Sequence, residues 1–342
     1  MFAAMTRLLL HIGDHKTGTS SIQQAFSNSP PDGWLYPVAG RADGAGHQNL
    51  AWQVGVDKRF DPAKGSLLDA AQEVARAAPD AVLISSEAFE FKKPALAVPM
   101  IDAAFRKVAS ETPCLVWLRP HASRLLASFC ERVRRGVGPF DRDAFLDKML
   151  SGGGFGYSKR IESWRAASAP RGWEISIRPY HAPTLKNRDV IADFAEAAGL
   201  SEPLKTRDAR INRSPSAPAL RMMQICCAAF ERRKGSRGAR HRAAQISRAA
   251  MEAFGGDWPK PAWTTAEAHR IREACIRDAE RMDAMIGGNL FTAELDLAVS
   301  SASPDRRPLE PETEIALAAA ADFAAGGQRL PLVAAAAPRK AA

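Results

Sequence analysis

The sequence is poor in the features that mark several common classes of protein. Its five cysteines are scattered and show no C-x-x-C spacing, so no zinc ribbon or dithiol centre is expected, and the thiols should be buried and reduced. No run approaches the roughly 18 apolar residues of a membrane helix. The early run RLLLHI is too short for the core of a signal peptide. We therefore expect a soluble, cytoplasmic protein without a transmembrane segment.

Acidic residues are fewer than basic residues in this sequence. The 342 residues include 47 lysines and arginines against 38 aspartates and glutamates, a net charge of +9. This balance favours a polyanionic partner such as nucleic acid, an acidic glycan, a membrane surface or a phosphorylated cofactor. Aromatic residues make up only 7% and do not interleave with the basic run at 231–242, and no nucleic-acid recognition motif is present. We expect no nucleic-acid partner, and we interpret the run as a solvated loop or an attractor of an anionic acceptor.

What is present is an alternation of apolar runs and helix-like segments. Four short apolar runs predict buried strands, at Arg7–Ile12, Ala81–Glu87, Cys114–Leu118 and Trp173–Tyr180. Helical periodicity predicts helices before three of them, at Leu67–Ala77, Val98–Ala109 and Lys159–Ala167. This alternation is typical of a doubly wound α/β fold with a parallel sheet.

The second half of the chain has a different character. Beyond about Gly199, residues 217–235, 241–254 and 264–287 have helical periodicity and few β-branched residues, which predicts helices. From about Ser300 the chain is rich in proline and alanine, which indicates a weakly ordered tail with one helix around Glu312–Ala325. We expect a core at residues 1–212, helices packed on it at 213–298, and the tail at 299–342.

The loop after the first predicted strand concentrates glycine, lysine and hydroxyl residues. Residues 11–26 read HIGDHKTGTSSIQQAF, so a strand, a glycine-bearing loop and a helix follow one another. In an open α/β sheet this first turn is the usual phosphate cradle. Lys16 supplies a positive charge, and the N–H groups of Thr19, Ser20 and Ser21 open a helix whose dipole favours an anion. The simpler alternative is an N-capped helix, but a cap needs neither the glycines nor the lysine.

The order of residues in this loop differs from that of nucleotide triphosphatases. Lys16 precedes Gly18 and the hydroxyls, the reverse of G-x-x-x-x-G-K-[ST]. The loop closely resembles the 5′-phosphosulfate loop of sulfotransferases that use 3′-phosphoadenosine 5′-phosphosulfate (PAPS), whose hallmark is K-x-G-T-[ST] after the first strand. The resemblance implies a three-layer parallel-sheet α/β fold of P-loop type with added C-terminal helices, and no metal. Candidate residues for the 5′-phosphate and sulfuryl group are Lys16, Thr17, Gly18, Thr19, Ser20 and the adjoining Ser21.

The same resemblance implies a second part of the donor site. In the family, an arginine at the end of a later strand and a serine in the following helix hold the 3′-phosphate. Here Arg119 follows the predicted strand, and Ser128 stands one position beyond the serine of the pattern, which falls on Ala127. Either Ser128 takes the role, or Ser123 or Arg124 contributes, or the contact is weakened. An arginine fork suits a phosphate monoester.

Sulfuryl transfer to a hydroxyl needs a general base beside the attacking oxygen. Glu87 follows an apolar run, where sheet topology is expected to bring it into the cleft of Lys16, and it resembles in position the glutamate base of glycan sulfotransferases. Alternatively, Glu87 caps the next helix or pairs with Lys92 or Lys93. Histidine is the competing base, because it titrates near neutral pH. His47, in a glycine-flanked loop, is the candidate.

The sequence therefore predicts an enzyme, a PAPS-dependent sulfotransferase acting on a hydroxyl or amine of a carbohydrate, lipid or small metabolite. The resemblance extends from Arg7 to about Asn212, and Arg233–Gly235 resembles the R-K-G stretch that closes over the 3′-phosphate in eukaryotic cytosolic sulfotransferases. One alternative is a P-loop kinase or NTPase, although the lysine order is reversed and no magnesium-binding aspartate follows the second predicted strand. The other is a basic nucleic-acid-binding or scaffold protein, suggested by charge.

Overall fold

The structure of the protein is a computed structural model that describes residues 6–42, 44–151, 156–204, 214–233, 239–255 and 258–303. These residues group into two compact units. The first comprises the described residues of 6–120, 157–204 and 284–288, and the second those of 121–156, 214–283 and 289–303. Residues 121–156, which the sequence analysis placed with the core, thus group with the later helices. The expected helix around Glu312–Ala325 lies outside the described residues.

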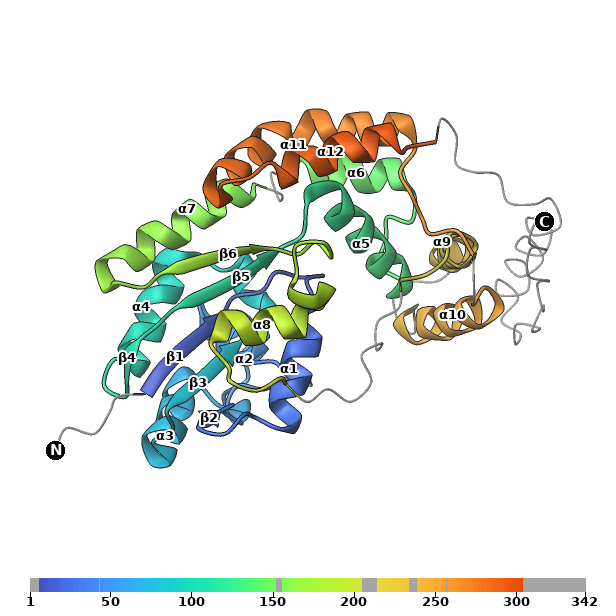
Figure 1. The fold of residues 1–342 in the computed structure, drawn as a ribbon. Helices are drawn as coiled ribbons and strands as arrows, with labels where there is room; N and C mark the ends of the chain where they lie inside the picture. The colour runs from blue at the N-terminus through green and yellow to red at the C-terminus, as the bar shows by residue number, and fades with distance from the viewer. Residues whose placement is uncertain are drawn as a thin grey trace. The chain divides into compact units, whose positions relative to one another are not determined.

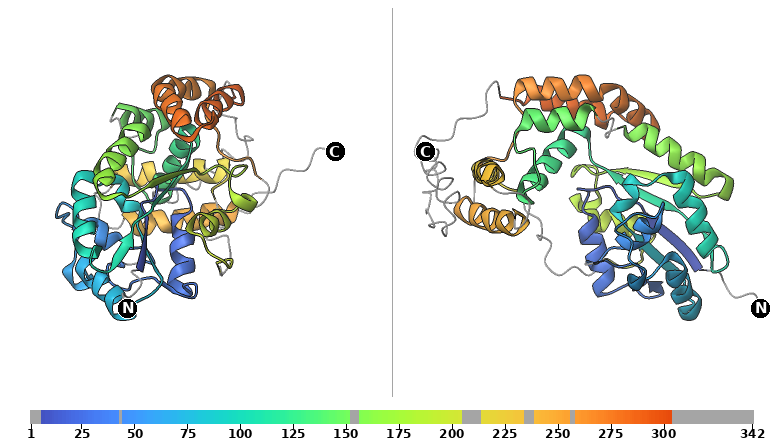
Figure 2. Two further views of the ribbon diagram at one scale, coloured as in Figure 1. Left: turned by 60° about the vertical axis from the view of Figure 1, so that its left-hand side comes forward. Right: turned by 180° about the vertical axis from the view of Figure 1, so that it is seen from behind.

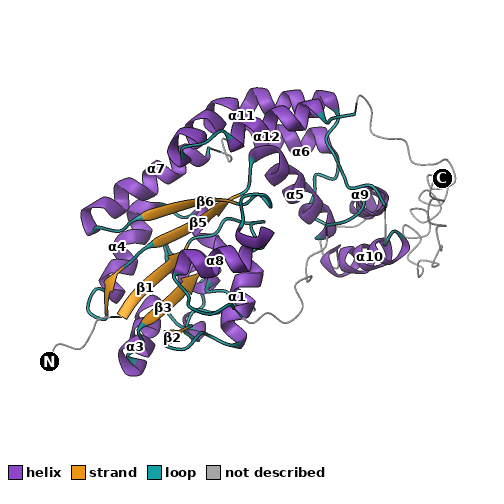
Figure 3. Cartoon of the chain, viewed as in Figure 1, coloured by secondary structure: helices purple, strands orange, loops and turns teal. Residues whose placement is uncertain are grey.

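The first unit is built on a six-stranded sheet. The strand order is β2-β3-β1-β5-β6, β4 pairs with β1 beside this path, and the described pairings are parallel. The strands are β1 (Thr6–His11), β2 (Trp34–Leu35), β3 (Ala81–Ser85), β4 (Ala109–Glu111), β5 (Cys114–Leu118) and β6 (Ile175–Pro179). Figure 3 shows them gathered in one sheet. The predicted α/β class with a parallel sheet is confirmed.

The predicted strands are all present, and three of them have slightly different ends. β1 and β6 lie within two residues of prediction, and β5 has its predicted bounds. β3 ends at Ser85 because the Ser86 hydroxyl accepts a hydrogen bond from the N–H of Ala88 at 3.2 Å and begins the 3₁₀ turn η2 (Glu87–Phe91). β2 and β4 were not predicted, since segments of two and three residues are too short to show a period.

Helices cover both faces of this sheet. On one face, side chains of β1, β3 and β5 pack with Ile22 and Phe26 of α1 (Thr19–Asn28) and Phe194 of α8 (Val190–Ala198). The alternate strand residues, such as Leu8 and Ile84, are also buried, because successive side chains point to opposite faces. Figures 1 and 2 show α1 beside α8, and α4 beside α7 away from them. This arrangement is compatible with a three-layer α/β fold.

Local signals explain the bounds of the helices in this unit. α3 (Leu67–Ala77) has its predicted bounds, because Ser66 and Asp69 form a capping box. α4 spans Pro94–Phe105 rather than Val98–Ala109, because a proline opens its first turn and Ala109 belongs to β4. α7 (Tyr157–Ser168) contains the predicted Lys159–Ala167. The short elements are α2 (Gln48–Gln53), η1 (Pro62–Lys64), η3 (Ala169–Arg171) and η4 (Lys186–Arg188).

The described part of the second unit is helical, with one isolated bridge between Thr264 and Ser303. Its helices are α5 (His121–Arg134), α6 (Arg142–Ser151), α9 (Ala217–Arg233), α10 (Ala239–Ala253), α11 (Thr265–Ile286, whose last residues group with the first unit) and α12 (Leu290–Ser300). The three helices predicted for the second half are confirmed as α9, α10 and α11, whereas α6 and α12 were not predicted. Across the described ranges, every helix is too short or too polar to cross a membrane.

Candidate functional site

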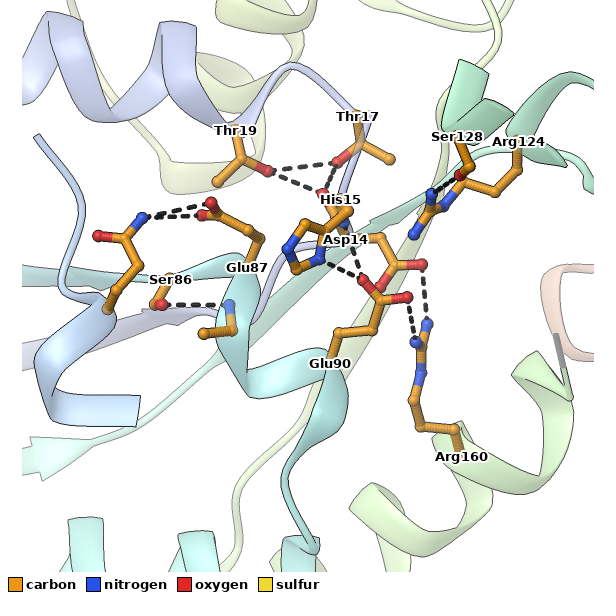
Figure 4. A network of polar contacts seen from close by, with 12 residues as sticks. Asp14, His15, Thr17, Thr19, Ser86, Glu87, Glu90, Arg124, Ser128 and Arg160 are labelled. Carbon is orange, nitrogen blue, oxygen red and sulfur yellow. Dashed lines mark hydrogen bonds and ion pairs between the residues drawn. The ribbon is translucent and has the colours of Figure 1, made fainter. Parts of the chain in front are cut away.

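The candidate site lies at the carboxyl edge of the sheet in the first unit. His11, the last residue of β1, is in register with Ser85, the last residue of β3, so these two parallel strands end level. β5 runs three residues beyond Leu115, the partner of His11. The loop after β1 continues along β5, since the N–H of Asp14 donates to the Trp117 carbonyl at 3.1 Å. Figure 4 shows this loop facing η2, which follows β3. The topology therefore brings the segments containing Lys16 and Glu87 together, as predicted.

The loop between β1 and α1 has an unusual backbone. Gly13, Lys16 and Gly18 have φ angles of 100°, 67° and 78°. Glycine adopts such values without steric cost, but a lysine rarely does, and such residues concentrate at ligand-binding loops. Gly18 is the N-cap residue of α1 and has no side chain with which to cap it. The main-chain N–H groups at the start of α1 are therefore not capped by that residue.

Gly13 lets the loop approach η2 closely. A Cβ atom at this position would lie 2.9 Å from the Cα atom of Glu87, which is closer than two such atoms tolerate. The absence of a side chain at Gly13 is thus what allows Glu87 to lie against the loop. The sequence showed the glycine, but not which residue approaches it.

Two glutamine side chains hold the carboxylate of Glu87. The amide of Gln23, on α1, donates to it at 3.0 Å, and the amide of Gln48, on α2, donates at 3.3 Å. Gly46 leaves room for this arrangement, since a Cβ there would lie 2.5 Å from the Gln23 amide. The carboxylate is partly exposed. The two amide donors, which come from α1 and α2, therefore fix the position of the Glu87 carboxylate.

The alternative roles considered for Glu87 belong to other residues in the structure. The cap of η2 is the hydroxyl of Ser86. The ammonium group of Lys92 bonds the carboxylate of Asp57 at 3.0 Å, and Lys93 is exposed. The described partners of Glu87 are instead neutral amides that converge on its carboxylate.

His47, the competing base, is placed differently from its prediction. It is fully buried; its Nδ1 accepts a hydrogen bond from the N–H of Ser85 at 3.1 Å, and its Nε2 donates to the Pro37 carbonyl at 2.9 Å. Burial lowers the pKa of His47 to about 4. Both ring nitrogens therefore hold main-chain groups, and the neutral ring ties the start of the site to β3.

The hydroxyls of the loop divide into two pairs. Thr17 and Thr19 are buried, and their hydroxyls donate to the carbonyl of Asp14 at 2.6 and 3.0 Å. Ser20 and Ser21 are exposed on the first turn of α1. The threonine hydroxyls, which were expected to reach the donor, thus close the loop on itself, while the two serines face outward.

Arg119, the predicted cation after β5, lies in the same unit as the loop. Its guanidinium lies over the ring of Tyr180, 4.7 Å from the ring centroid, and its carbonyl accepts a hydrogen bond from the Tyr157 hydroxyl at 3.0 Å. The Tyr180 ring in turn borders the loop, since a Cβ at Gly18 would lie 3.4 Å from it. Tyr180 thereby connects Arg119 to the start of α1.

Ser128, the predicted partner of Arg119, belongs to the second unit, on α5. Its hydroxyl accepts a short hydrogen bond from the guanidinium of Arg124 (Figure 4). The N–H of Ser123 is bound by the carboxylate of Glu294 at 2.7 Å. The three residues considered for the 3′-phosphate on α5 therefore already have partners within their own unit. Of the R-K-G stretch, Lys234 and Gly235 lie outside the described residues.

Sequence reasoning missed Gln23, Gln48 and Tyr180. A signal existed for Gln23, which stands four residues after Thr19 and hence on the same helix face, and for Tyr180, which is the last residue of a predicted strand. Gln48 gave no signal beyond its neighbour His47. In the described part of the chain, no group of three or more histidine, cysteine or acidic side chains is placed to hold a metal ion. Comparisons with protein-family models, curated proteins and solved structures found no match.

Proposed function

We propose that the protein is a sulfotransferase that moves a sulfuryl group from PAPS to a hydroxyl or amine of a carbohydrate, lipid or small metabolite. The observation that carries this proposal is the loop after β1, where Lys16 precedes Gly18 and the uncapped start of α1 at the carboxyl edge of a parallel sheet. Such a helix start, with a lysine beside it, favours a phosphate or sulfate group.

The donor binds through residues of the first unit in this proposal. Lys16 and the N–H groups of Thr19 and Ser20 bind the 5′-phosphate and the sulfuryl group, which the glycines allow to approach the backbone. The N–H of Ser21, which was expected to join them, donates instead to the Gly18 carbonyl at 2.9 Å. Arg119 binds the 3′-phosphate, because its planar fork suits a phosphate monoester. The net charge of +9 favours a donor and an acceptor that carry negative charge.

The chemistry assigns one role to Glu87 and one to Lys16. The acceptor oxygen forms a bond to sulfur while the bond from sulfur to the bridging oxygen of the 5′-phosphate breaks, leaving adenosine 3′,5′-bisphosphate. Glu87 takes the proton of the acceptor hydroxyl, and Lys16 stabilises the negative charge that develops on the bridging oxygen. Glu87 is assigned in preference to His47, because both nitrogens of His47 hold main-chain groups.

Calorimetric titration tests the proposal against the two alternatives. Adenosine 3′,5′-bisphosphate should bind without magnesium, whereas ATP with Mg²⁺ and duplex DNA should bind more weakly or not at all. Lys16→Ala should weaken bisphosphate binding at least tenfold, by loss of a charged contact, and Lys93→Ala, which removes an exposed lysine on another segment, is the matched control. Binding of ATP with Mg²⁺ but not of the bisphosphate would favour a kinase or NTPase; preferential binding of DNA would favour the third class.

Transfer itself requires an acceptor. Incubation with ³⁵S-labelled PAPS and panels of carbohydrates, lipids and small hydroxyl or amine compounds should label at least one class. Absence of labelled product from every panel, together with absence of bisphosphate binding, overturns the proposal.

A further inference from the structure

Four charged or ionisable side chains form a row of contacts between the loop after β1, η2 and α7. They are Asp14, Arg160, Glu90 and His15. Asp14, in the loop, is fully buried, and its carboxylate lies 3.0 Å from the guanidinium of Arg160 on α7. The same guanidinium lies 3.3 Å from the carboxylate of Glu90 on η2. Glu90 then meets His15, the residue after Asp14. Figure 4 shows Arg160 between the two carboxylates.

Glu90 contacts His15 twice with one oxygen. Its Oε2 accepts the main-chain N–H of His15 at 3.1 Å and lies 2.6 Å from Nδ1 of the ring. The contact to the main chain fixes the backbone immediately before Lys16, whose φ of 67° is one that a lysine rarely adopts. The row of contacts is therefore attached to the loop at two consecutive residues, both on the N-terminal side of the lysine.

The guanidinium of Arg160 is largely buried and contacts both carboxylates. Only 17% of its side chain is exposed, against 1% for Asp14 and 6% for Glu90. Burial acts to lower the pKa of Arg160, but the two carboxylates raise it above its usual range, so the cation is retained. Two buried carboxylates beside each other require such a cation, because an uncompensated buried charge is strongly unfavourable. The Arg160 guanidinium also lies 5.3 Å from the centroid of the Tyr157 ring.

The turn η2 connects this row of contacts to the carboxylate assigned as base. Glu87 begins η2 and lies against Gly13, whereas Glu90, three residues later, holds His15. One short turn thus touches the loop on both sides of Asp14. A displacement of the loop would be transmitted to η2 through both contacts.

We propose that Arg160 and Glu90 are positioning residues that hold the loop Gly13–Gly18 in its anion-binding conformation before the donor arrives. The proposal rests on the proposed function in taking that loop as the donor site. Preorganisation of this kind lowers the ordering cost of binding, so it acts on affinity for the donor. Neither residue needs to touch the donor.

Amide hydrogen exchange in the ligand-free protein tests the proposal directly. The amides of Asp14 and His15 are held by Trp117 and Glu90, so Arg160→Met and Glu90→Gln should accelerate their exchange by about tenfold or more, while amides of β3 keep wild-type rates. Arg160→Lys keeps the positive charge but lacks the planar guanidinium, so the exchange rates of both amides should lie between those of the wild type and Arg160→Met. Arg171→Met, which removes a partly exposed partner of Asp102 at 3.3 Å, is the control and should leave both amides unchanged.

Bisphosphate titration of the same variants supplies the second readout. Arg160→Met and Glu90→Gln should weaken binding about tenfold, and Arg171→Met should not. If Arg160→Met does not fold, Glu90→Gln and Arg160→Lys carry the test. Wild-type protection of both amides in these variants overturns the positioning role. If the wild-type protein binds no bisphosphate, the proposed function fails, while the exchange rates still decide whether Arg160 and Glu90 hold the loop.

Discussion

The loop after β1 contains one half of the sequence pattern, and the segment from Arg119 into α5 contains the other. The side chains of the two halves have different kinds of partner in the structure. Around the loop, Glu87 of η2, Gln23 of α1 and Gln48 of α2 converge within a single compact unit. The other half is divided between the units, because Arg119, which precedes α5, belongs to the first unit and Ser128, on α5, to the second.

The difference lies in the partners of the side chains. The carboxylate of Glu87 accepts hydrogen bonds from the amides of Gln23 and Gln48, which come from two other elements. Ser128 accepts a hydrogen bond from Arg124, a partner within its own helix. The loop half of the pattern thus gathers side chains from three elements around Glu87, whereas Ser128 of the other half is bound by a neighbour on its own helix.

The largest expected effects separate Glu87 from Lys16. Glu87→Gln should reduce turnover of ³⁵S-labelled PAPS with an identified acceptor by roughly 10²- to 10⁴-fold, because it removes the base, and should leave bisphosphate affinity unchanged. Lys16→Ala should reduce both turnover and affinity. Near-normal turnover of Glu87→Gln would remove the base assignment and reopen the question for His47.

The second prediction concerns the buried histidines that support the loop region. Burial lowers the pKa of His11 and of His47 to about 4 from 6.5, so the unfolded chain takes up these protons at higher pH than the folded protein does. The free energy of unfolding should therefore be constant above pH 6.5 and fall by about 3 kcal/mol for each histidine between pH 6.5 and 4.

Urea unfolding at pH 7 and pH 5 measures this effect. His47→Gln should reduce the loss of stability between the two pH values, because it removes one of the two groups that the unfolded chain protonates. The same substitution at His269, which is exposed on α11, is the control. Equal losses for the wild type and His47→Gln would show that His47 is not held neutral in the folded state.

The third prediction addresses Arg119. Arg119→Ala should weaken adenosine 3′,5′-bisphosphate binding about 10- to 100-fold, the usual range for a lost charged hydrogen bond. Binding of adenosine 5′-phosphosulfate, which lacks the 3′-phosphate, should be unchanged in the same titration. An equal loss for both ligands would show that Arg119 acts on the loop through Tyr180 rather than on the 3′-phosphate.

The smallest effect is expected at Ser128. Its hydroxyl is bound by Arg124, so Ser128→Ala should change bisphosphate affinity by less than about threefold, as expected for a residue that does not contact the ligand. A loss as large as that of Arg119→Ala would show that α5 completes the 3′-phosphate site, and the two halves of the pattern would then behave alike.

Much of the fold was predictable from local signals. The apolar runs gave the four main strands, and the capping box at Ser66 and Asp69 gave the bounds of α3. The errors occur where a local signal was absent or was overridden by pairing. β2 is only two residues long, and α4 ends early because Ala109 pairs with Thr6 of β1.

The site was predictable in part. The positions of Lys16, Gly18 and Glu87 at one edge of the sheet follow from the parallel direction of the strands, which the alternation of strands and helices indicates. The surroundings of His47 did not follow, because nothing in the residues around it shows that Ser85 and Pro37 bind its two nitrogens.

The sequence alone determined the parallel α/β class and the loop with its lysine before the glycine, since both depend on residues close together in the chain. Only the tertiary structure decided that Gln48 holds Glu87, that Arg160 joins Asp14 to Glu90, and that His47 serves the main chain. These contacts join residues far apart in the sequence, such as Gln48 and Glu87, which are 39 positions apart. Such pairs form only when the elements pack together, and the periodicity of a short segment does not show which elements will pack against it.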